Sequence, residues 1–347
     1  MNLTPSMRAA LASSEDLQVR AIQYVPSVLR EMGVSPAAVL RAAGLKPNAL
    51  TNLDRRLPFT QVGRLAVECV NATGCQHFGL IVGERAGPVA AGIIHELMRF
   101  TTNVHAALCA LRAHLHLHDR GAVVTLTDAP DDQVEVAYVI HHHDTIGSEQ
   151  ITDGGIAVML LLLQSLLGPR WAPTCAAFAR SRPPDIAPYA RLFRAPLAFD
   201  APRTALFIPR SLLDHAIPGS DSRREAAIRE LIARAEAANP RSLSLRVKEL
   251  LSAMLVESEP TFDQVATAFG TSRRTLRRRL ALEGTSVTAL RNEIKAEFAR
   301  QLLVNSTMSI IDIGATLHYT KPGAFSRAYK GWTGASPQEA RRNAGRR

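Results

Sequence analysis

The sequence has few of the features that mark secreted, metal-binding or membrane proteins. Its 347 residues include four cysteines, and no two of these are spaced as Cys-x-x-Cys. This scarcity argues against a disulfide framework and against a structural zinc site. The longest apolar stretch, residues 156–167, is interrupted by Gln164 and Ser165 and is shorter than the roughly 20 residues of a membrane span. We therefore predict a buried helix there.

Motifs that mark common enzymes are also missing. No G-x-S-x-G, P-loop or G-x-G-x-x-G element occurs, so neither a nucleophile nor a phosphate-binding loop is predicted. The first sixteen residues contain no apolar run of signal-peptide length. We expect a cytoplasmic protein that is not an enzyme and uses no cofactor or metal, with residues 1–16 as a flexible N-terminal segment.

The excess positive charge is concentrated in the C-terminal third. The chain has 41 Lys and Arg against 31 Asp and Glu, a formal net charge of +10. Residues 240–347 hold 18 of the basic and 9 of the acidic side chains, so these 108 residues carry a net charge of +9. A nucleic acid, an anionic membrane or an acidic partner would fit the total charge. Its concentration in one part of the chain predicts two domains, of which one is basic.

Residues 17–215 show the hydrophobic patterns of an α+β domain. Apolar residues recur every three or four positions in several segments, and they alternate in others. The predicted helices are 17–32, 36–43, 58–72, 103–114 and 149–167. The predicted strands are 122–128, 133–140, 174–179 and 205–208. The first two strands are separated by Ala-Pro-Asp-Asp, which predicts a hairpin turn.

Residues 216–240 are predicted to contain a helix that joins the two domains. Ser222 and Glu225 form a capping box, Ile228 and Ile232 share an apolar face, and Asn239-Pro240 ends the helix. Two interpretations are open. The helix packs on its own domain, or it makes a dimer contact.

The basic region contains a helix-turn-helix pattern. Residues 261–264 form a capping box before a short helix that ends at Gly270, and Ser272 caps a second helix. In this layout the second helix enters the major groove of DNA. Five arginines lie within seven residues of that helix, and a guanidinium group can bind guanine or phosphate. The predicted DNA-binding residues of this unit are Ser272, Arg273, Arg274, Arg277 and Arg278.

A second unit of the same kind begins 48 residues later. Ser309 caps a short helix, His318 and Tyr319 occupy the turn, and Thr320 is predicted to cap the following helix. The predicted DNA-binding residues of this unit are Thr320, Lys321, Gly323, Ser326 and Arg327. A helix predicted at 286–305 lies between the units and would span about 30 Å. That length is close to the ~34 Å between successive major grooves, so the two recognition helices could occupy adjacent grooves.

The two units also carry a family resemblance. The stretches FDQVATAFGTSRRTLRRRLALEGTS and SIIDIGATLHYTKPGAFSRAYKGWTGASPQEAR resemble the DNA-binding domain of AraC/XylS-family transcriptional regulators. The resemblance implies that Arg274, Arg277 and Arg278 read bases. It also implies that Ser272 and Thr320 contact backbone phosphates, and that the groove-facing residues of the second helix are Gly323, Ser326 and Arg327. The chain departs from the family pattern at His318, where a glycine is usual, and at Gly323, where a serine is common.

Residues 17–215 are similar to the arabinose-binding-type N-terminal domain of a subgroup of the same family. The similar stretches include VRAIQYVPSVLREMGV and PYARLFRAPLAFDAPRTALFIP. The resemblance implies an α+β effector-binding and dimerisation domain at 17–215, an inter-domain helix and linker at 216–240, and an all-α DNA-binding domain at 241–347 with two helix-turn-helix motifs joined by a linker helix. Its implied partners are promoter DNA, a small-molecule effector, a second copy of the chain and, for an activator, RNA polymerase, with no membrane. The low aromatic content of 5% mildly favours a small or partly apolar effector.

Other interpretations compete with this one. The protein could bind DNA without an effector, or an enzyme domain such as a DNA-repair methyltransferase could be fused to the basic domain. Such an enzyme would need a reactive cysteine, and Cys175 has no His or Glu beside it in the sequence. The arginines could form a solvated face or a membrane patch. Cys69 and Cys75 could sense oxidants. The histidine groups could bind a metal, and they comprise His114, His116, His118, His141, His142 and His143.

Overall fold

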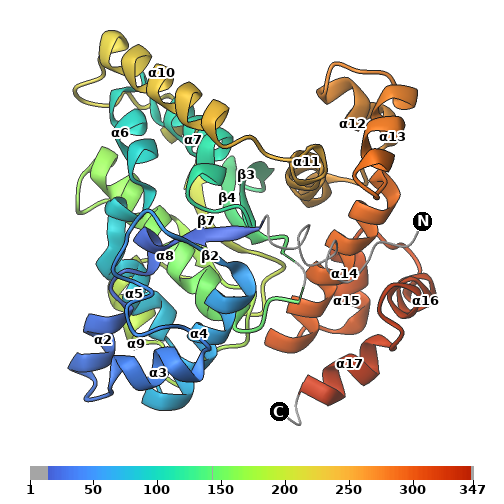
Figure 1. Ribbon diagram of the computed structural model, residues 1–347, viewed down its shortest axis with the longest axis horizontal. Helices are drawn as coiled ribbons and strands as arrows, with labels where there is room; N and C mark the ends of the chain where they lie inside the picture. Colours follow the sequence, from blue (N-terminus) through green and yellow to red (C-terminus); the bar gives the residue numbers. More distant parts are fainter. Residues whose placement is uncertain (1–14, 143, 345–347) are drawn as a thin grey trace.

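The protein consists of two lobes that lie side by side (Figure 1). The computed structural model describes residues 15–142 and 144–344. Most of the segment expected to be a flexible N-terminal arm, residues 1–14, lies outside the described residues, as does His143. Residues 15 and 16 belong to the folded part, because Glu15 is buried and a strand begins at Asp16.

The N-terminal lobe is built around a five-stranded sheet with the order β3-β4-β7-β5-β6. The strands are β3 (Ala122–Ala129), β4 (Gln133–Ile140), β5 (Cys175–Ala177), β6 (Leu197–Ala198) and β7 (Thr204–Pro209). Strands β3 and β4 form the predicted hairpin, with Ala129 opposite Gln133. Asp131 and Asp132 in its turn adopt positive φ, a conformation that aspartate tolerates better than most residues. The predicted α+β fold of this lobe is confirmed.

A second, two-stranded sheet was not predicted. Strand β1 (Asp16–Gln18) pairs with β2 (Arg56–Pro58), and a 3₁₀-helix η1 (Val19–Ile22) follows β1. The helix expected from residue 17 onward therefore begins only at α2 (Val25–Glu31). A three-residue strand has too few alternating positions to be distinguished from one turn of an amphipathic helix.

Helices cover the sheet and form most of the N-terminal lobe. They are α3 (Pro36–Ala42), α4 (Phe59–Thr73), α5 (Phe78–Ala86), η2 (Gly87–Ala91), α6 (Ile93–Phe100), α7 (Val104–His114), η3 (Leu115–Leu117), α8 (Ser148–Leu167), α9 (Ala187–Phe193) and η4 (Arg210–Asp214). Helix α8 is long and apolar enough to cross a membrane by length and composition, but 56% of that window is buried inside the lobe. It packs closely on α5, where a Cβ atom added to Gly79 would lie 2.0 Å from the Gln150 carbonyl oxygen.

Strand β4 is buried on both faces, and the two faces belong to different lobes. Val134, Val136 and Tyr138 point into the core of the N-terminal lobe. Ala137 and Val139 alternate with them and pack on Val256 and Phe298 of the C-terminal lobe. The sheet therefore packs on the N-terminal core with one face and on the C-terminal lobe with the other.

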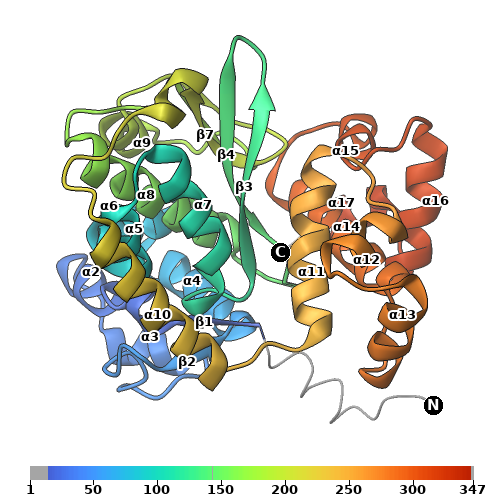
Figure 2. The ribbon, with the colours of Figure 1, turned by 90° about the horizontal axis from the view of Figure 1, so that it is seen from above.

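The inter-domain helix α10 (Ser222–Ala238) packs on the N-terminal lobe (Figure 2). Ile232 is buried against Leu97 of α6 and Ala110 of α7. The helix cap differs from the predicted one, because Asp221 accepts hydrogen bonds from the backbone N–H groups of Arg223 and Arg224. Asp221 precedes Ser222 and places a carboxylate at the positive end of the helix, which favours it as the cap.

The C-terminal lobe is all-α, as predicted. Its helices are α11 (Leu243–Glu257), α12 (Phe262–Ala268), α13 (Arg273–Leu282), α14 (Val287–Asn305), α15 (Ile310–Thr316), α16 (Pro322–Thr333) and α17 (Pro337–Ala344). One apolar cluster joins α11, α12, α13 and the first half of α14, and another joins the second half of α14 to α15 and α16. The 19-residue helix α14 thus connects two small cores, at about 28 Å in length.

Candidate DNA interface, inter-lobe contact and cavity

The first helix-turn-helix unit has the caps and the turn predicted from its sequence. Thr261 and Gln264 form the capping box of α12, and Gly270 adopts a φ of +59° in the turn. The Ser272 hydroxyl accepts a hydrogen bond from the Thr275 N–H at 3.2 Å and caps α13. Leu276 and Leu280 are fully buried. Their burial fixes the rotation of α13 and turns its arginines outward.

The arginines of α13 are exposed, and they differ in their contacts. Arg273 forms an exposed ion pair with Asp263 at 2.9 Å. Arg273 and Arg277 both lie over the Phe262 ring, at 5.4 and 5.8 Å from its centre. Within residues 15–142 and 144–344, no hydrogen bond or ion pair holds Arg274 or Arg278. These two guanidinium groups have all their donors available for DNA.

The turn of the second unit is formed by a histidine in the left-handed region. His318 adopts a φ of +67°, and its Nε2 atom forms a hydrogen bond of 2.8 Å with the Leu255 carbonyl oxygen of α11. The turn forms as expected despite the missing glycine. The side chain also anchors it to α11, a contact that the local sequence does not indicate because the two residues are 63 positions apart.

The start of the second recognition helix differs from the prediction. Helix α16 begins at Pro322 with Lys321 as its N-cap, and no side chain caps it. A proline disfavours the helical conformation for the residue before it, and Lys321 is extended with φ −120° and ψ 121°. Thr320 therefore lies one position outside the cap and is exposed. The expectation that Thr320 caps this helix is wrong.

Helix α16 still presents the predicted DNA-facing positions. Phe325 and Tyr329 are buried in the C-terminal core, whereas Gly323, Arg327 and Lys321 are exposed and Ser326 is half-buried. A Cβ atom at Gly323 would lie 3.4 Å from Nη1 of Arg327, which is an ordinary contact with the end of a flexible side chain. Helices α13 and α16 both lie on the side of the C-terminal lobe that faces away from the sheet (Figures 1 and 2).

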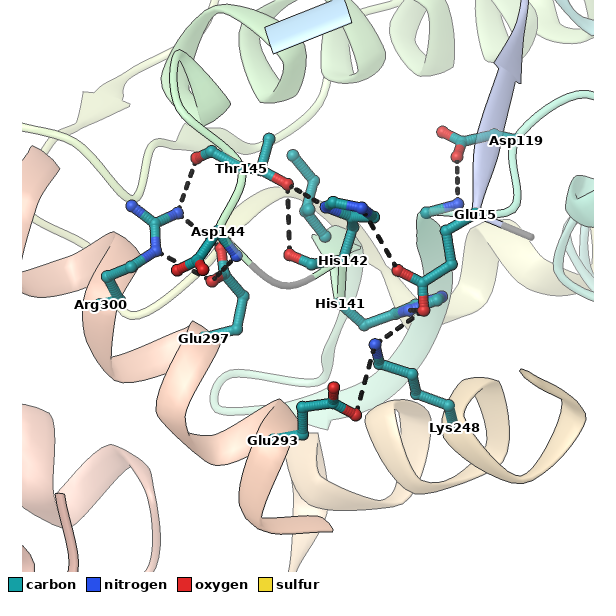
Figure 3. A network of polar contacts seen from close by, with 12 residues as sticks. Glu15, Asp119, His141, His142, Asp144, Thr145, Lys248, Glu293, Glu297 and Arg300 are labelled. Carbon is teal, nitrogen blue, oxygen red and sulfur yellow. Dashed lines mark hydrogen bonds and ion pairs between the residues drawn. The ribbon is translucent and has the colours of Figure 1, made fainter. Parts of the chain in front are cut away.

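A buried ion pair joins α11 to the N-terminal lobe (Figure 3). Lys248 Nζ donates to Glu15 Oε1 at 2.7 Å, and both side chains are less than 10% exposed. His141 and His142 lie 3.9 and 3.8 Å from the Glu15 carboxylate. Burial raises the pKa of Glu15, although Lys248 opposes this. Burial alone would lower the pKa of Lys248, but Glu15 and Glu293 outweigh it and the pKa is raised.

A second polar contact holds the last two turns of α14 against the segment that follows β4. Arg300 donates to the Thr145 carbonyl oxygen at 2.6 Å and pairs with the fully buried Glu297. Glu297 in turn accepts a hydrogen bond of 2.9 Å from the Asp144 N–H, and Asn305 donates to the Ser148 hydroxyl at 2.9 Å. These partners are more than 150 residues apart. Sequence reasoning missed them because no local pattern indicates such pairs.

The N-terminal lobe contains a cavity of about 130 Å³. Its walls are formed by apolar residues of η1, α4, α5, η2 and α8. The polar residues that line it include His118, Asp119, Tyr138 and Gln150. Tyr138 donates its hydroxyl hydrogen to Asp119, and burial raises the pKa of Asp119 to about 6. The sequence did not assign any ligand-binding residue, and these four come from three separate parts of the lobe.

The described residues support neither a metal site at the histidines nor a reactive thiol at Cys69 or Cys175. His114 Nδ1 lies 2.9 Å from the Glu236 carboxylate of α10, and no cluster of three or more potential metal ligands occurs among the described residues. Burial raises the pKa of Cys69 to about 12 and also raises the pKa of Cys175. A raised pKa leaves less thiolate, the form that reacts with oxidants or accepts an alkyl group.

These features define a class: a DNA-binding regulator with two helix-turn-helix units attached to a domain that contains a cavity. Comparisons with known proteins place it more narrowly. Residues 33–217 match the model of the arabinose-binding domain of AraC transcription regulators, and residues 265–343 match a helix-turn-helix domain. The first match covers more than half of the chain. The chain therefore belongs to the AraC family of transcription regulators, and it is a regulator rather than an enzyme.

Two relatives align over nearly their whole length. The ornithine utilization regulator of Pseudomonas aeruginosa is 26% identical over 335 residues, which are 95% of this chain and 97% of that protein. The regulator VirS of Mycobacterium tuberculosis is 20% identical over 315 residues, 90% of this chain and 93% of that protein. The crystal structure of the regulator CdpR from Pseudomonas aeruginosa aligns over 99% of this chain with 19% identity and a TM-score of 0.44.

Proposed function

We propose that the protein is an effector-responsive activator that reads two adjacent major-groove segments of promoter DNA with α13 and α16. The observation that carries this proposal is the arrangement of the C-terminal lobe. Two helices with exposed basic side chains are attached to one rigid helix of about 28 Å, and both face away from the N-terminal lobe. A regulator bound across one turn of B-DNA needs such a spacing.

The residues have different roles in this proposal. Arg274, Arg277 and Arg278 read base edges, because the buried Leu276 and Leu280 leave them on the open side of α13. Arg273 and Lys321 contact phosphates, together with Ser272, which caps α13, and Thr320, which precedes the N-cap of α16. Arg273 must exchange its ion pair with Asp263 for a phosphate, and an exposed ion pair costs little to break. The second helix reads DNA through Gly323, Ser326 and Arg327.

The N-terminal lobe, residues 17–215, acts as the sensor, and α10 within 216–240 connects it to the DNA-binding domain at 241–347. The cavity supplies a site for an effector, which favours a sensor over a DNA-binding protein that needs no ligand. Tyr138 lines this cavity, and its neighbours Ala137 and Val139 touch α11 and α14 on the other face of β4. A ligand that shifts β4 would therefore change the packing of the DNA-binding domain.

The proposed setting is the cytoplasm, with the protein on the nucleoid when it is bound to DNA. The active form is a homodimer that contacts RNA polymerase at the promoter. Leu231 on α10 is 52% exposed and lies on the helix next to the buried Ile232. This residue offers an apolar contact for a second copy, but most of the apolar face of α10 already packs on its own lobe.

The test is selection of a binding site from random DNA, followed by gel-shift titration of variants. We expect R274A and R278A each to weaken specific binding by about 1–3 kcal/mol and to relax the base preference at one position. The matched control is R55A, which removes an exposed arginine from the N-terminal lobe. If R274A and R278A bind the selected site as tightly as R55A does, α13 does not read the bases.

A further inference from the structure

We propose that Lys295 is a positioning residue for DNA recognition. It ties the first helix-turn-helix unit to the turn of the second, and it thereby fixes the spacing between the two DNA segments that the protein accepts. This inference rests on the proposed reading of two adjacent major grooves and adds a residue that determines specificity without touching DNA. Three observations support it: the contacts of Lys295, the contacts of the turn before α16, and the separation of the two helical cores.

Lys295 contacts both units from α14, the helix that joins them (Figure 1). Its side chain is buried, so its ammonium group binds protein groups rather than DNA. That group pairs with the carboxylate of Glu259, which lies between α11 and α12 at the start of the first unit. It also donates to the Leu317 carbonyl oxygen at 3.2 Å, in the turn of the second unit. An ammonium group has three donors, so one side chain can hold both partners at once.

The Glu259 carboxylate is held at both of its oxygens. Oε2 pairs with Lys295, and Oε1 lies 3.1 Å from Arg291, which is one turn earlier on α14. Burial lowers the pKa of Lys295, and Glu259 opposes this, so Glu259 favours the charged form of the lysine. Thr261, the N-cap of α12, follows two residues later. The pair therefore holds the start of the first unit against the middle of α14.

The turn of the second unit transmits the position of Lys295 to the recognition helix. Lys295 Nζ lies 4.7 Å from the centre of the Tyr319 ring, a cation–π contact. The Tyr319 ring packs in turn on Phe325 and Trp332 of α16, with ring centres 5.8 and 6.2 Å apart. A change at Lys295 would therefore shift α16 through Tyr319.

The second unit needs such contacts because its other links to the first unit are few. The two units have separate apolar cores, and α14 contributes to both. No described side chain caps α16. Besides Lys295, the turn is tied to the first unit by the hydrogen bond between His318 and the Leu255 carbonyl oxygen. The orientation of α16 relative to α13 thus depends on these polar ties as well as on α14.

A fixed orientation has a consequence for the DNA sequence that is read. One added base pair moves the second segment by about 3.4 Å along the duplex and rotates it by about 34°. A protein whose two units are held rigidly cannot follow this change, so one unit loses its base contacts. A looser junction can follow it, although the second unit must then be ordered on binding. The Lys295 tie therefore predicts a narrow tolerance for spacing.

The test is gel-shift titration of the full-length protein on the selected DNA site and on duplexes with one base pair inserted or deleted between the two segments. The spacing penalty is the ratio of Kd on the altered duplex to Kd on the selected site. We expect a penalty of about 10- to 100-fold for the wild type, equivalent to one or two base contacts. K295M and E259A should each reduce this penalty by about 3- to 10-fold. The matched control K46M removes an exposed lysine of the N-terminal lobe and should keep the wild-type penalty.

Two further measurements separate positioning from a general loss of structure. On a duplex that keeps only the first segment, K295M and the wild type should bind equally, because Lys295 does not lie on α13. K295R keeps a cation with several donors and should restore the wild-type penalty. Glu259 is 41% exposed, so E259A breaks the tie with little loss of stability and replaces K295M if that variant fails to fold.

The proposal is overturned if K295M and E259A show the same spacing penalty as the wild type. It is also overturned if K295R tolerates altered spacing as K295M does, since packing rather than the cation would then set the orientation. R327A separates these outcomes from failure of the proposed function. If R327A binds the selected site as tightly as K46M does, the second unit does not read DNA and the proposed function fails. If R327A weakens binding while K295M keeps the wild-type penalty, only the role of Lys295 is wrong.

Discussion

The two helix-turn-helix units have the same layout but depend on different parts of the protein. The first unit is specified by neighbouring residues. A glycine forms its turn, Ser272 caps α13, and five arginines lie on that helix. The second unit has a histidine in its turn, no side-chain cap on α16, and two basic residues, Arg327 and Lys330, on that helix. Its geometry depends on α11 through His318 and Leu255.

This difference indicates how the sensor could affect the two units. Helix α11 contributes to the core of the first unit and also anchors the turn of the second. It is held to the N-terminal lobe by Lys248 and Glu15. A shift of α11 would therefore move parts of both units. The contacts of Arg300 and Asn305 instead hold the second half of α14, which packs on the second unit.

The largest expected effect comes from removal of Lys248. K248M leaves the Glu15 carboxylate buried without its cation. Removal of one partner of a buried ion pair lowers the free energy of unfolding by about 3–5 kcal/mol. We expect this decrease in the free energy of unfolding at pH 8, measured by urea titration of the full-length protein. The matched control is the double variant E15Q/K248M, which removes both charges and should recover most of the loss.

The loss in K248M should depend on pH. Burial already raises the pKa of Glu15, and Lys248 opposes this, so its removal raises the pKa further. A carboxyl group whose pKa is higher in the folded state than in the unfolded state costs stability when it is ionised. The cost begins to fall as the pH drops through the folded pKa, and it disappears below the lower pKa of the unfolded state. The difference between K248M and the wild type should therefore shrink from pH 8 toward acidic pH, and a constant difference would contradict this explanation.

An intermediate effect distinguishes the two helix starts. S272A removes the cap of α13 and should reduce the free energy of unfolding by about 0.5–2 kcal/mol. T320A removes a hydroxyl that caps nothing, so the expected change is within about 0.5 kcal/mol. Urea titration of both variants tests the comparison. Equal losses would mean that Thr320 does cap α16 in solution.

The smallest effect is expected at the turn of the second unit. H318G relieves the cost of a positive φ but loses the hydrogen bond to Leu255, and the two effects of about 1 kcal/mol each nearly cancel. H318A loses the bond and keeps the strained conformation, so it should be less stable than H318G. The order of the two variants in urea titration checks this, and greater stability of H318A would contradict the role assigned to the turn.

Much of the fold could be predicted from the sequence where the determining residues are neighbours. The β3–β4 hairpin follows from alternation and an Asp-rich turn, and the caps at Asn103, Thr261, Ser272 and Ser309 follow from short polar motifs. Two cap predictions were wrong by one residue. The N-cap of α10 is Asp221 rather than Ser222, because the carboxylate lies one position earlier. The N-cap of α16 is Lys321 rather than Thr320, because Pro322 follows Lys321.

The sequence by itself determined the helix-turn-helix cores and the outward direction of the arginines, because periodic burial of Leu276 and Leu280 sets the rotation of a helix. The tertiary structure alone decided which residues meet across the lobes and around the cavity. Glu15 and Lys248 are 233 positions apart, and Gln18 and His118 are 100 apart. A local pattern reports the environment of one segment, whereas the partner of a buried polar group depends on how distant segments pack together.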